Sequence, residues 1–463
     1  MKNKVYNSGY VFGITLVATI GGLLFGYDTA VISGAEKSIE SFLIKPLGLS
    51  AFIHGATVSS ALIGCILGGA LSGFFSSRLG RKKSLLLAAC LFFLSALGSG
   101  FPETLFFSHD EPSVGLLFLF NFYRILGGIG VGLASAVCPM YIGEIAPAEI
   151  RGRLVSFNQF AIIFGMLVVY FVNWGIANGQ AIEWINSVGW RYMFASEAIP
   201  AALFGIFVFF VPETPRYLAL VHQDEKALNV LEKINGSKEK AQTILNEIKE
   251  TVSESVKGKL FSYGVKVIII GILLSVFQQF VGINVALYYA PRIFESMGAA
   301  KDASMLQTIV MGLVNVIFTV IAILTVDKWG RKPLLIVGSV GMAIGMFAIS
   351  TLAYLNIIGI STLVFIIIYT ASFMMSWGPI CWVLIAEIFP NKIRGQAVAV
   401  AVAAQWAANY LISSTYPPMM EYSGALTYGF YGLMAVLSAL FVWKMIPETK
   451  GKTLEEMEQY WKK

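Results

Sequence analysis

The chain contains about twelve long apolar runs, and each of them is long enough to cross a lipid bilayer as one helix. About 20 consecutive apolar residues are needed to span the hydrocarbon core in this way. Only 13% of the 463 residues are charged, which is about half the share found in a soluble domain. The sequence therefore predicts an all-α membrane protein with about twelve transmembrane helices. The runs lie near residues 11–34, 54–77, 84–100, 115–139, 154–174, 191–211, 261–290, 305–326, 334–353, 357–384, 396–416 and 426–446.

The loops between the runs alternate in charge, and this alternation predicts an orientation. Loops rich in Lys and Arg stay on the cytoplasmic side of a membrane. Both chain ends are therefore expected in the cytoplasm, with the protein in the cell (inner) membrane. The net charge of +6 comes from these loops and does not indicate a nucleic-acid partner. The basic residues that define the loops are Arg78, Arg81, Lys82, Lys83, Arg151, Arg153, Lys328, Arg331, Lys332, Lys392 and Arg394.

The two halves of the chain repeat one another. Three motifs occur in each half, in the same order. RLGRK at 78–82 corresponds to KWGRK at 328–332, and EIAPAEIRG at 144–152 corresponds to EIFPNKIRG at 387–395. PETPR at 212–216 corresponds to PETKG at 447–451. Parallel six-helix repeats are typical of the major facilitator fold. We therefore expect two pseudo-symmetric six-helix bundles joined by a cytoplasmic helical linker. The expected divisions are a first bundle at 1–211, a linker at 212–259, a second bundle at 260–446 and a cytoplasmic tail at 447–463.

The repeated Glu and Arg residues lie at the cytoplasmic ends of the expected helices. A Glu–Arg pair between neighbouring helices can form in one state and separate in another, which biases an open–closed equilibrium. The alternative is simple anchoring of the topology by positive charge, and both roles can hold. The predicted gating residues are Arg81, Glu144, Arg151, Arg331, Glu387 and Arg394.

Three charged residues occur deep inside runs of the first half: Asp28, Arg124 and Glu197. A charge inside a membrane span is costly and marks a functional site by default. At 1.5 Å per residue, all three lie about 10–13 Å below the outer surface, and this equal depth makes a cluster possible. Arg124 beside Asp28 favours the carboxylate, and separation from Arg124 favours protonation. We expect Asp28 to be the proton site in alternating contact with Arg124, assisted by Glu197; a static ion pair that fixes packing is the alternative.

The spans of the second half hold neutral amides instead of charges, with aromatic residues nearby. Amides offer both donors and acceptors to hydroxyl groups, so such a site favours an uncharged polyol. On a straight helix Gln278 and Asn284 point about 120° apart, whereas Asn284 and Tyr288 share a face. The helix is therefore expected to break near Gly282, as helices do at transporter binding sites. The alternative is that these amides only hold helices together.

Nine segments together resemble the sugar porter family of the major facilitator superfamily: GGLLFGYDTAVISG, the RLGRK loop, YIGEIAPAEIRG, PETPR, FQQFVGIN, the DKWGRK loop, WGPICW, AEIFPNKIRG and PETKGKTLEE. The resemblance covers nearly the full length. SFNQFAIIFG, WRYMFASE and AVAAQWAANY look most similar to the proton-coupled xylose symporters of bacteria. The resemblance implies that the protein transports a monosaccharide together with a proton by alternating access. Among the sugars, D-xylose is expected first.

The resemblance also implies the sugar contacts. Hydrogen bonds to the sugar are expected from Gln159, Gln278, Gln279, Asn284, Trp382 and Gln405, and the cavity lining from Phe25, Tyr288, Gly378 and Trp406. Met166 departs from the pattern, because xylose symporters carry a Gln at this position. A thioether removes a donor and an acceptor, and losing a hydroxyl contact changes discrimination between substrates. A symporter or a facilitator for glucose, galactose or arabinose therefore stays open.

The remaining reactive residues give no sign of catalysis. The four cysteines lie in apolar runs at unrelated spacing and are interpreted as reduced core residues, and the three histidines show no metal-ligand spacing. No nucleophile–base set or phosphate loop occurs, so we expect neither an enzyme nor a cofactor or metal site. A sugar receptor is a further alternative, although the linker is short for an output domain. The expected partners are a monosaccharide, a proton and membrane lipid, and the protein is expected to work as a monomer. The four cysteines are Cys65, Cys90, Cys138 and Cys381, and the three histidines are His54, His109 and His222.

Overall fold

The computed structural model describes residues 6–104, 111–147, 150–253, 260–296, 298, 300–357, 359–390, 393–450 and 459–461. The regular secondary structure of these residues is helical throughout, and no strand occurs among them. Twelve helical stretches are long and apolar enough to cross a membrane. The predicted fold class and number of spans are therefore confirmed. His109 and Lys392 lie outside the described residues.

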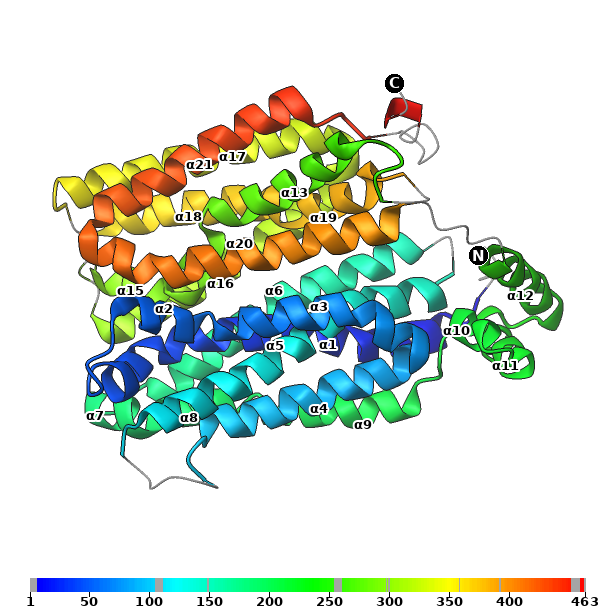
Figure 1. The fold of residues 1–463 in the computed structure, drawn as a ribbon, viewed down its shortest axis with the longest axis horizontal. Coiled ribbons are helices and arrows are strands. Elements are labelled where there is room, and N and C mark those ends of the chain that lie inside the picture. The colour runs from blue at the N-terminus through cyan, green and yellow to red at the C-terminus, as the bar shows by residue number, and fades with distance from the viewer. Residues whose placement is uncertain are drawn as a thin grey trace.

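The helices form two bundles that lie side by side, with a small helical group at one end (Figure 1). We call the end of the bundles next to this group the linker end and the opposite one the far end. The first bundle consists of α1 (Ser8–Ile39) with its π-helical continuation η1 (Glu40–Ile44), α2 (Ala51–Val58), α3 (Ser60–Arg78), α4 (Arg81–Gly100), α5 (Val114–Ile145), α6 (Arg151–Ala177), α7 (Ile182–Trp184), η2 (Ile185–Gly189), α8 (Trp190–Ala195) and α9 (Ala198–Phe210).

The linker group and the second bundle follow in chain order. The linker helices are α10 (Pro215–Leu220), α11 (Asp224–Asn235) and α12 (Lys238–Ser253). The second bundle consists of α13 (Val265–Phe280), α14 (Ile283–Tyr288), α15 (Ala290–Ser296), α16 (Lys301–Trp329), α17 (Arg331–Tyr354), α18 (Ile360–Met375), α19 (Trp377–Ile388), α20 (Arg394–Tyr422) and α21 (Gly424–Met445).

Close contact between α1 and α6 depends on glycine. An added Cβ at Gly26 would lie 1.8 Å from the carbonyl oxygen of Ile162, and one at Gly165 would lie 2.1 Å from that of Leu23. Each helix thus uses a glycine to bring its backbone against that of the other. Small residues are what permit such crossings in membranes, where apolar lipid gives no hydrophobic drive for helices to associate. This contact fixes the helix that carries Phe25 and Asp28.

The helix that enters the second bundle breaks where the sequence predicts. α13 ends at Phe280, Gly282 takes a left-handed φ of 90°, and α14 starts at Ile283. Tyr369 donates its hydroxyl to the carbonyl oxygen of Val281 at 2.7 Å, so the interrupted backbone is satisfied inside the protein. A non-helical backbone at membrane depth is tolerated only with such internal partners. The break turns the amides on its two sides toward one another.

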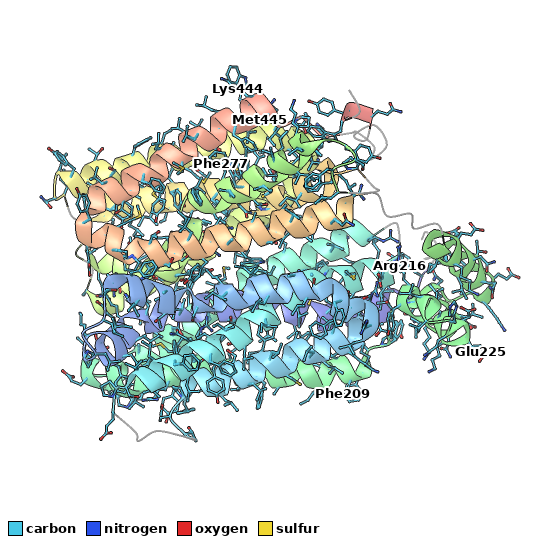
Figure 2. The ribbon with its side chains drawn as sticks, in the orientation of Figure 1. Phe209, Arg216, Glu225, Phe277, Lys444 and Met445 are labelled. Carbon is cyan, nitrogen blue, oxygen red and sulfur yellow. The ribbon has the colours of Figure 1, made fainter. Side chains whose placement is uncertain are left out.

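Large apolar side chains cover the outside of both bundles. Phe118, Phe209 and Trp443 are 70%, 66% and 61% exposed, and Phe209 projects outward in Figure 2. The linker carries charged residues such as Arg216 and Glu225, which Figure 2 shows beyond the bundles. An apolar surface with a polar group at one end matches a protein embedded in lipid with its linker in water.

Several predicted span limits differ from the structure, and the fourth and eleventh spans end six residues later than expected. The first span continues past 34 to Ile44, the second run divides into α2 and α3, and the sixth span begins at Ile182. The extension of the first span has a physical reason. Glu36 and Lys37 end the apolar run in the sequence, but Glu36 is buried and both residues form ion pairs with α15, so the helix continues.

The glycine contact generates a stability prediction. Replacing Gly26 by Ala forces a methyl group against the α6 backbone, and we expect destabilisation of about 1–3 kcal/mol, as for other overpacked sites. Gly175→Ala is the matched control, because Gly175 is helical and an added Cβ there meets no atom within 4 Å. Thermal unfolding of the two purified variants measures the difference. Equal melting temperatures for both variants would show that the α1–α6 contact does not depend on Gly26.

Candidate functional site

The three buried charges of the first bundle lie together. Arg124 on α5 donates Nη1 to Oδ1 of Asp28 at 2.7 Å and Nη2 to the carbonyl oxygen of Asp28 at 3.1 Å. Glu197, between α8 and α9, interacts electrostatically with both residues. All three side chains are almost completely buried. The structure therefore brings together the three residues that the depth estimate placed at one level.

The cluster holds two carboxylates for one guanidinium, and several of its polar atoms lack a partner among the described residues, Nε of Arg124 included. Among the described residues, Oδ2 of Asp28 and both carboxylate oxygens of Glu197 are buried without a hydrogen-bond partner. Buried polar atoms in native proteins are normally paired, so each exception calls for an explanation. A carboxylate only accepts hydrogen bonds, whereas a protonated carboxyl group also donates one. A single proton on either acid would supply the missing donor.

Neighbouring residues hold the cluster in place. An added Cβ at Gly127 would lie 3.1 Å from Oδ1 of Asp28, so this glycine makes room for the carboxylate. The guanidinium of Arg124 lies over the ring of Phe194 at 5.2 Å. Tyr27 and Ser196, the residues before the two acids, share a hydrogen bond of 2.7 Å. The acids are therefore positioned by contacts on both sides.

Neutral amides form a continuous chain in the second bundle. Nε2 of Gln278 donates to the carbonyl oxygen of Trp377 at 3.0 Å and faces that of Gly378 at 3.4 Å. Its Oε1 accepts from Nε2 of Gln279 at 3.1 Å and from Nε2 of Gln405. Oε1 of Gln279 in turn accepts from Nδ2 of Asn284 at 2.5 Å, across the helix break. Four of the predicted sugar-binding amides thus meet, from α13, α14 and α20.

Aromatic residues stand beside the amide chain. The ring centroids of Phe25 on α1 and Trp406 on α20 lie 5.7 Å apart, and this contact joins the two bundles. Tyr288 accepts a hydrogen bond from Asn409 at 3.3 Å. Among the described residues, Nε1 of Trp406 and Oε1 of Gln405 are buried without a partner. A donor and an acceptor are therefore left for a hydroxylated ligand.

Two predicted sugar contacts stand apart from this chain. Gln159 on α6 and Trp382 on α19 are half-buried, and no described hydrogen bond links either of them to the amides. Met166, which replaces the expected glutamine, is buried in the apolar core. An added Cβ at Gly26 would lie 3.1 Å from its backbone nitrogen. Met166 therefore packs beside the helix that carries Phe25.

Four of the six predicted gating residues form two equivalent ion pairs at the linker end. Arg81 donates hydrogen bonds from Nε and Nη2 to the Glu144 carboxylate at 2.9 and 2.7 Å. Arg331 donates hydrogen bonds from the same two nitrogens to the Glu387 carboxylate at 3.3 and 3.0 Å. Both pairs stay within one bundle, so the repeat in sequence is a repeat in geometry.

The other two predicted gating arginines are placed differently. Arg151 is exposed and forms no ion pair with a described residue, and Arg394 donates to the carbonyl oxygen of Phe389 at 3.5 Å.

Sequence reasoning missed two glutamates that complete these pairs. Glu213 accepts the backbone N–H groups of Arg81 and Lys82, and Glu448 accepts those of Arg331 and Lys332. A carboxylate at a helix N-terminus is favoured by the helix dipole. Burial raises the pKa of Glu213 above its ordinary value, whereas at Glu448 backbone donors outweigh burial and lower the pKa. The signal was present in the repeated PET of PETPR and PETKG.

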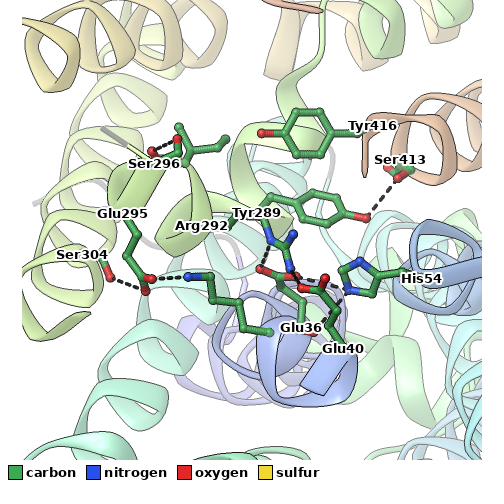
Figure 3. A network of polar contacts seen from close by, with 12 residues as sticks. Glu36, Glu40, His54, Tyr289, Arg292, Glu295, Ser296, Ser304, Ser413 and Tyr416 are labelled. Carbon is green, nitrogen blue, oxygen red and sulfur yellow. Dashed lines mark hydrogen bonds and ion pairs between the residues drawn. The ribbon is translucent and has the colours of Figure 1, made fainter. Parts of the chain in front are cut away.

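The sequence did not reveal one group around a histidine. The structure places His54 beside Glu36 and Glu40, with one ligand atom from each residue within 4.8 Å of the others (Figure 3). The acids come from α1 and η1 and the histidine from α2, so linear spacing did not reveal the group.

The cysteine prediction holds only in part. All four cysteines are free, and three of them are buried as expected. Cys90 is exposed on α4, so its interpretation as a core residue is wrong.

Twelve spans in two repeated bundles, a buried charge cluster and a neutral amide site define a membrane transporter of the major facilitator class. The chain matches the family described as "Sugar (and other) transporter" over residues 14–461 and belongs to that family.

Related proteins cover nearly the whole chain. The D-xylose-proton symporter of Escherichia coli (strain K12) is 54% identical over 99% of this chain and 97% of the relative. The glucose transport protein of Synechocystis sp. is 42% identical over 97% of each. Among solved structures, the inward open conformation of the xylose transporter XylE from E. coli matches with a TM-score of 0.89 at 54% identity, covering 98% of this chain and 100% of that one.

The charge cluster generates the second prediction. Arg124→Met leaves two buried carboxylates without a cation, and breaking a buried pair in this way costs about 3–5 kcal/mol. Glu197→Gln in the same chain removes one of the two charges, so the double variant should regain part of the lost stability. Thermal unfolding of both variants measures this, with Arg151→Met as the exposed arginine control. If the double variant is no more stable than Arg124→Met, Glu197 is not part of the charge balance.

Proposed function

We propose that this chain imports D-xylose together with a proton across the cytoplasmic membrane by alternating access. The observation that carries the proposal is the buried Asp28–Arg124–Glu197 cluster, which holds two carboxylates and one arginine inside a sugar transporter. The 54% identity to a protein named D-xylose-proton symporter supports both the substrate and the coupling.

The proton site works by exchange of partners. In the outward-open state a proton binds Asp28, neutralises it and weakens its bond to Arg124. The guanidinium stays charged at any accessible pH, and the unpartnered oxygens of Glu197 offer it a second acceptor. After the protein turns inward, the proton leaves and the Asp28–Arg124 pair forms again. The pair is present in this structure, which fits a state after proton release.

Helix α1 links the proton to the sugar. Phe25 lies three residues before Asp28, and residues at this spacing are neighbours on a helix surface. Phe25 contacts Trp406, which follows Gln405 of the amide chain. A shift of α1 on protonation therefore reaches the sugar site directly. Gln278, Gln279, Asn284 and Gln405 bind the sugar hydroxyls, and the aromatic rings cover its C–H faces.

The other proposed contacts act around this core. Gln159 and Trp382 join the site when the bundles close on sugar, and Tyr288 and Gly378 complete the lining. The pairs Arg81–Glu144 and Arg331–Glu387, with Arg151 and Arg394, act as the gate at the linker end. The protein works as a monomer in the lipid of the inner membrane, with both chain ends and the linker in the cytoplasm. The basic loops at the linker end support this orientation.

Coupling makes accumulation possible. One charge crossing about 100 mV releases about 2.3 kcal/mol, which supports a sugar gradient of about 45-fold. Asp28→Asn should therefore lose uphill uptake and reach only equal concentrations, while sugar counterflow continues. Both are measured in proteoliposomes, with the exposed Glu183→Gln as the control acid. Accumulation by Asp28→Asn under an imposed proton gradient would falsify the proton-site assignment.

The sugar site generates a separate prediction. Gln405→Ala removes an amide that a bound hydroxyl uses, and we expect the apparent Kd for D-xylose to rise about 10- to 100-fold, the range for a lost buried hydrogen bond. Gln242→Ala in the linker is the matched control. Counterflow with competing D-xylose, D-glucose, D-galactose and L-arabinose gives the measurement. Unchanged competition in Gln405→Ala would remove this residue from the site.

A glucose transporter is the second candidate. Met166 in place of the expected amide and the 42% identity to a glucose transport protein favour it. The same panel decides between the two, because D-xylose that fails to compete in the unaltered protein excludes the xylose assignment. Met166→Gln then tests whether this position sets the preference.

A further inference from the structure

A cluster of ion pairs joins the two bundles at the far end (Figure 3). Glu36 on α1 and Glu40 on η1 lie one turn apart and face Arg292 of α15, which belongs to the second bundle. Nε of Arg292 donates to Oε1 of Glu36 at 2.8 Å, and Nη2 donates to Oε2 of Glu40. Lys37 pairs with Glu295 of α15 in the same contact. We call these five residues the far-end latch.

Arg292 is held strongly in this position. Burial alone acts to lower the pKa of its guanidinium, but Glu36 and Glu40 outweigh burial and raise it. Next to His54 on α2 the two bundles also touch by backbone, since an added Cβ at Gly55 would lie 2.2 Å from the carbonyl oxygen of Ser414 on α20. The far end is therefore closed in this structure by charge and by packing.

His54 adds a titratable group to the latch from the side of the first bundle. Its Nε2 lies 3.3 Å from Oε2 of Glu36 and 3.3 Å from the carbonyl oxygen of Glu36. The side chains of His54 and Glu36 are 2% and 1% exposed. The groups that face the imidazole are Glu36 and Glu40 from α1 and η1, Arg292 beyond them on α15, and the ring of Tyr289, whose centroid is 6.4 Å away.

We propose that the far-end latch closes the outer gate of the transport cycle and that a proton on His54 replaces Arg292 as the counter-charge of Glu36 and Glu40 when the gate opens. The proposal rests on the proposed function for its alternating access and orientation. Outward opening has to draw α15 away from α1 and η1, because the two sides of the latch belong to different bundles. The two carboxylates then lose Arg292. Glu40 keeps Lys45, whose Nζ lies 3.6 Å from its Oε1, and His54 is the group that stays beside the buried Glu36.

The direction of the pH effect follows from linkage. Imidazole changes its charge between about pH 5 and 8, and two neighbouring carboxylates without Arg292 favour the charged form. If opening favours protonation of His54, protonation of His54 favours opening by the same factor. Acid outside the cell therefore shifts the protein toward the outward-open state, the state in which it receives proton and sugar.

The experiment measures gate opening without sugar or a gradient. Ser414→Cys, in a Cys90→Ser background that removes the exposed native thiol, places a thiol in the buried α2–α20 contact. Labelling of the full chain in nanodiscs by a hydrophilic maleimide reports opening at about pH 5.5 and about pH 7.5. At each pH, the labelling rate is divided by the labelling rate of the same chain with His54→Gln. The intrinsic pH dependence of the thiol cancels in this ratio. We expect this ratio to be about fivefold higher at the lower pH, the lower range of allosteric coupling.

Further variants separate the latch from general loosening. Arg292→Gln should label faster at both pH values and lose most of the pH effect, and Arg292→Lys, which keeps a cation, should restore slower labelling. His222→Gln in the linker is the matched histidine control and should behave like the parent. A ratio that is equal at both pH values overturns the role of His54. Arg292→Gln labelling no faster than the parent overturns the latch.

These outcomes are distinct from a failure of the proposed function. Labelling needs no transport, so a chain that opens as predicted but does not couple sugar to protons refutes only the proposed symport. A chain that accumulates sugar but shows no pH-dependent labelling refutes only the latch.

Discussion

The ion pair between Asp28 and Arg124 is the interaction on which the arrangement of the first bundle depends. A buried guanidinium requires a carboxylate, and this cluster holds two carboxylates for one cation. With both acids ionised the cluster carries one net negative charge in a setting of low polarity, where uncompensated charge is costly. One proton makes it neutral. In the proposed mechanism this proton is taken up in the outward-open state, and the unpartnered oxygens of Asp28 and Glu197 are the acceptors available to it.

Glycine contacts fix the position of the helix that carries Asp28. The reciprocal contacts of Gly26 and Gly165 press α1 against α6 with backbone touching backbone, so α1 can change position against α6 only as a unit. Phe25 and Asp28 flank Gly26 on the same helix. In the proposed mechanism a change of charge at Asp28 acts through this helix on the ring contact between Phe25 and Trp406.

Local patterns in the sequence predicted the parts of the site that depend on one helix or on depth. The break at Gly282 follows from the angular positions of Gln278 and Asn284, and counting residues along two spans put Asp28 and Arg124 at one depth, where they can meet. The hydrogen bonds from Gln278 to Gln405 and to the Trp377 carbonyl depend on how α13, α19 and α20 pack. The group around His54 depends on a partner more than 200 residues away, Arg292, and on the continuation of α1 beyond its apolar run. No spacing in the sequence carries that information, because it arises only when the bundles meet.

The continuity of α1 connects the two charge clusters. The helix runs unbroken from Ser8 to Ile39, and Asp28 and Glu36 are eight residues apart, about 12 Å along its axis. A tilt that relieves the Asp28–Arg124 contact after protonation also displaces Glu36 relative to Arg292. The inner cluster and the far-end latch cannot respond independently, since one stiff helix carries an acid of each. In the two proposals, protons at the two levels then act in the same direction. The proton on Asp28 removes the charge that holds Arg124, and the proton on His54 supplies the counter-charge that Arg292 gives in the closed arrangement.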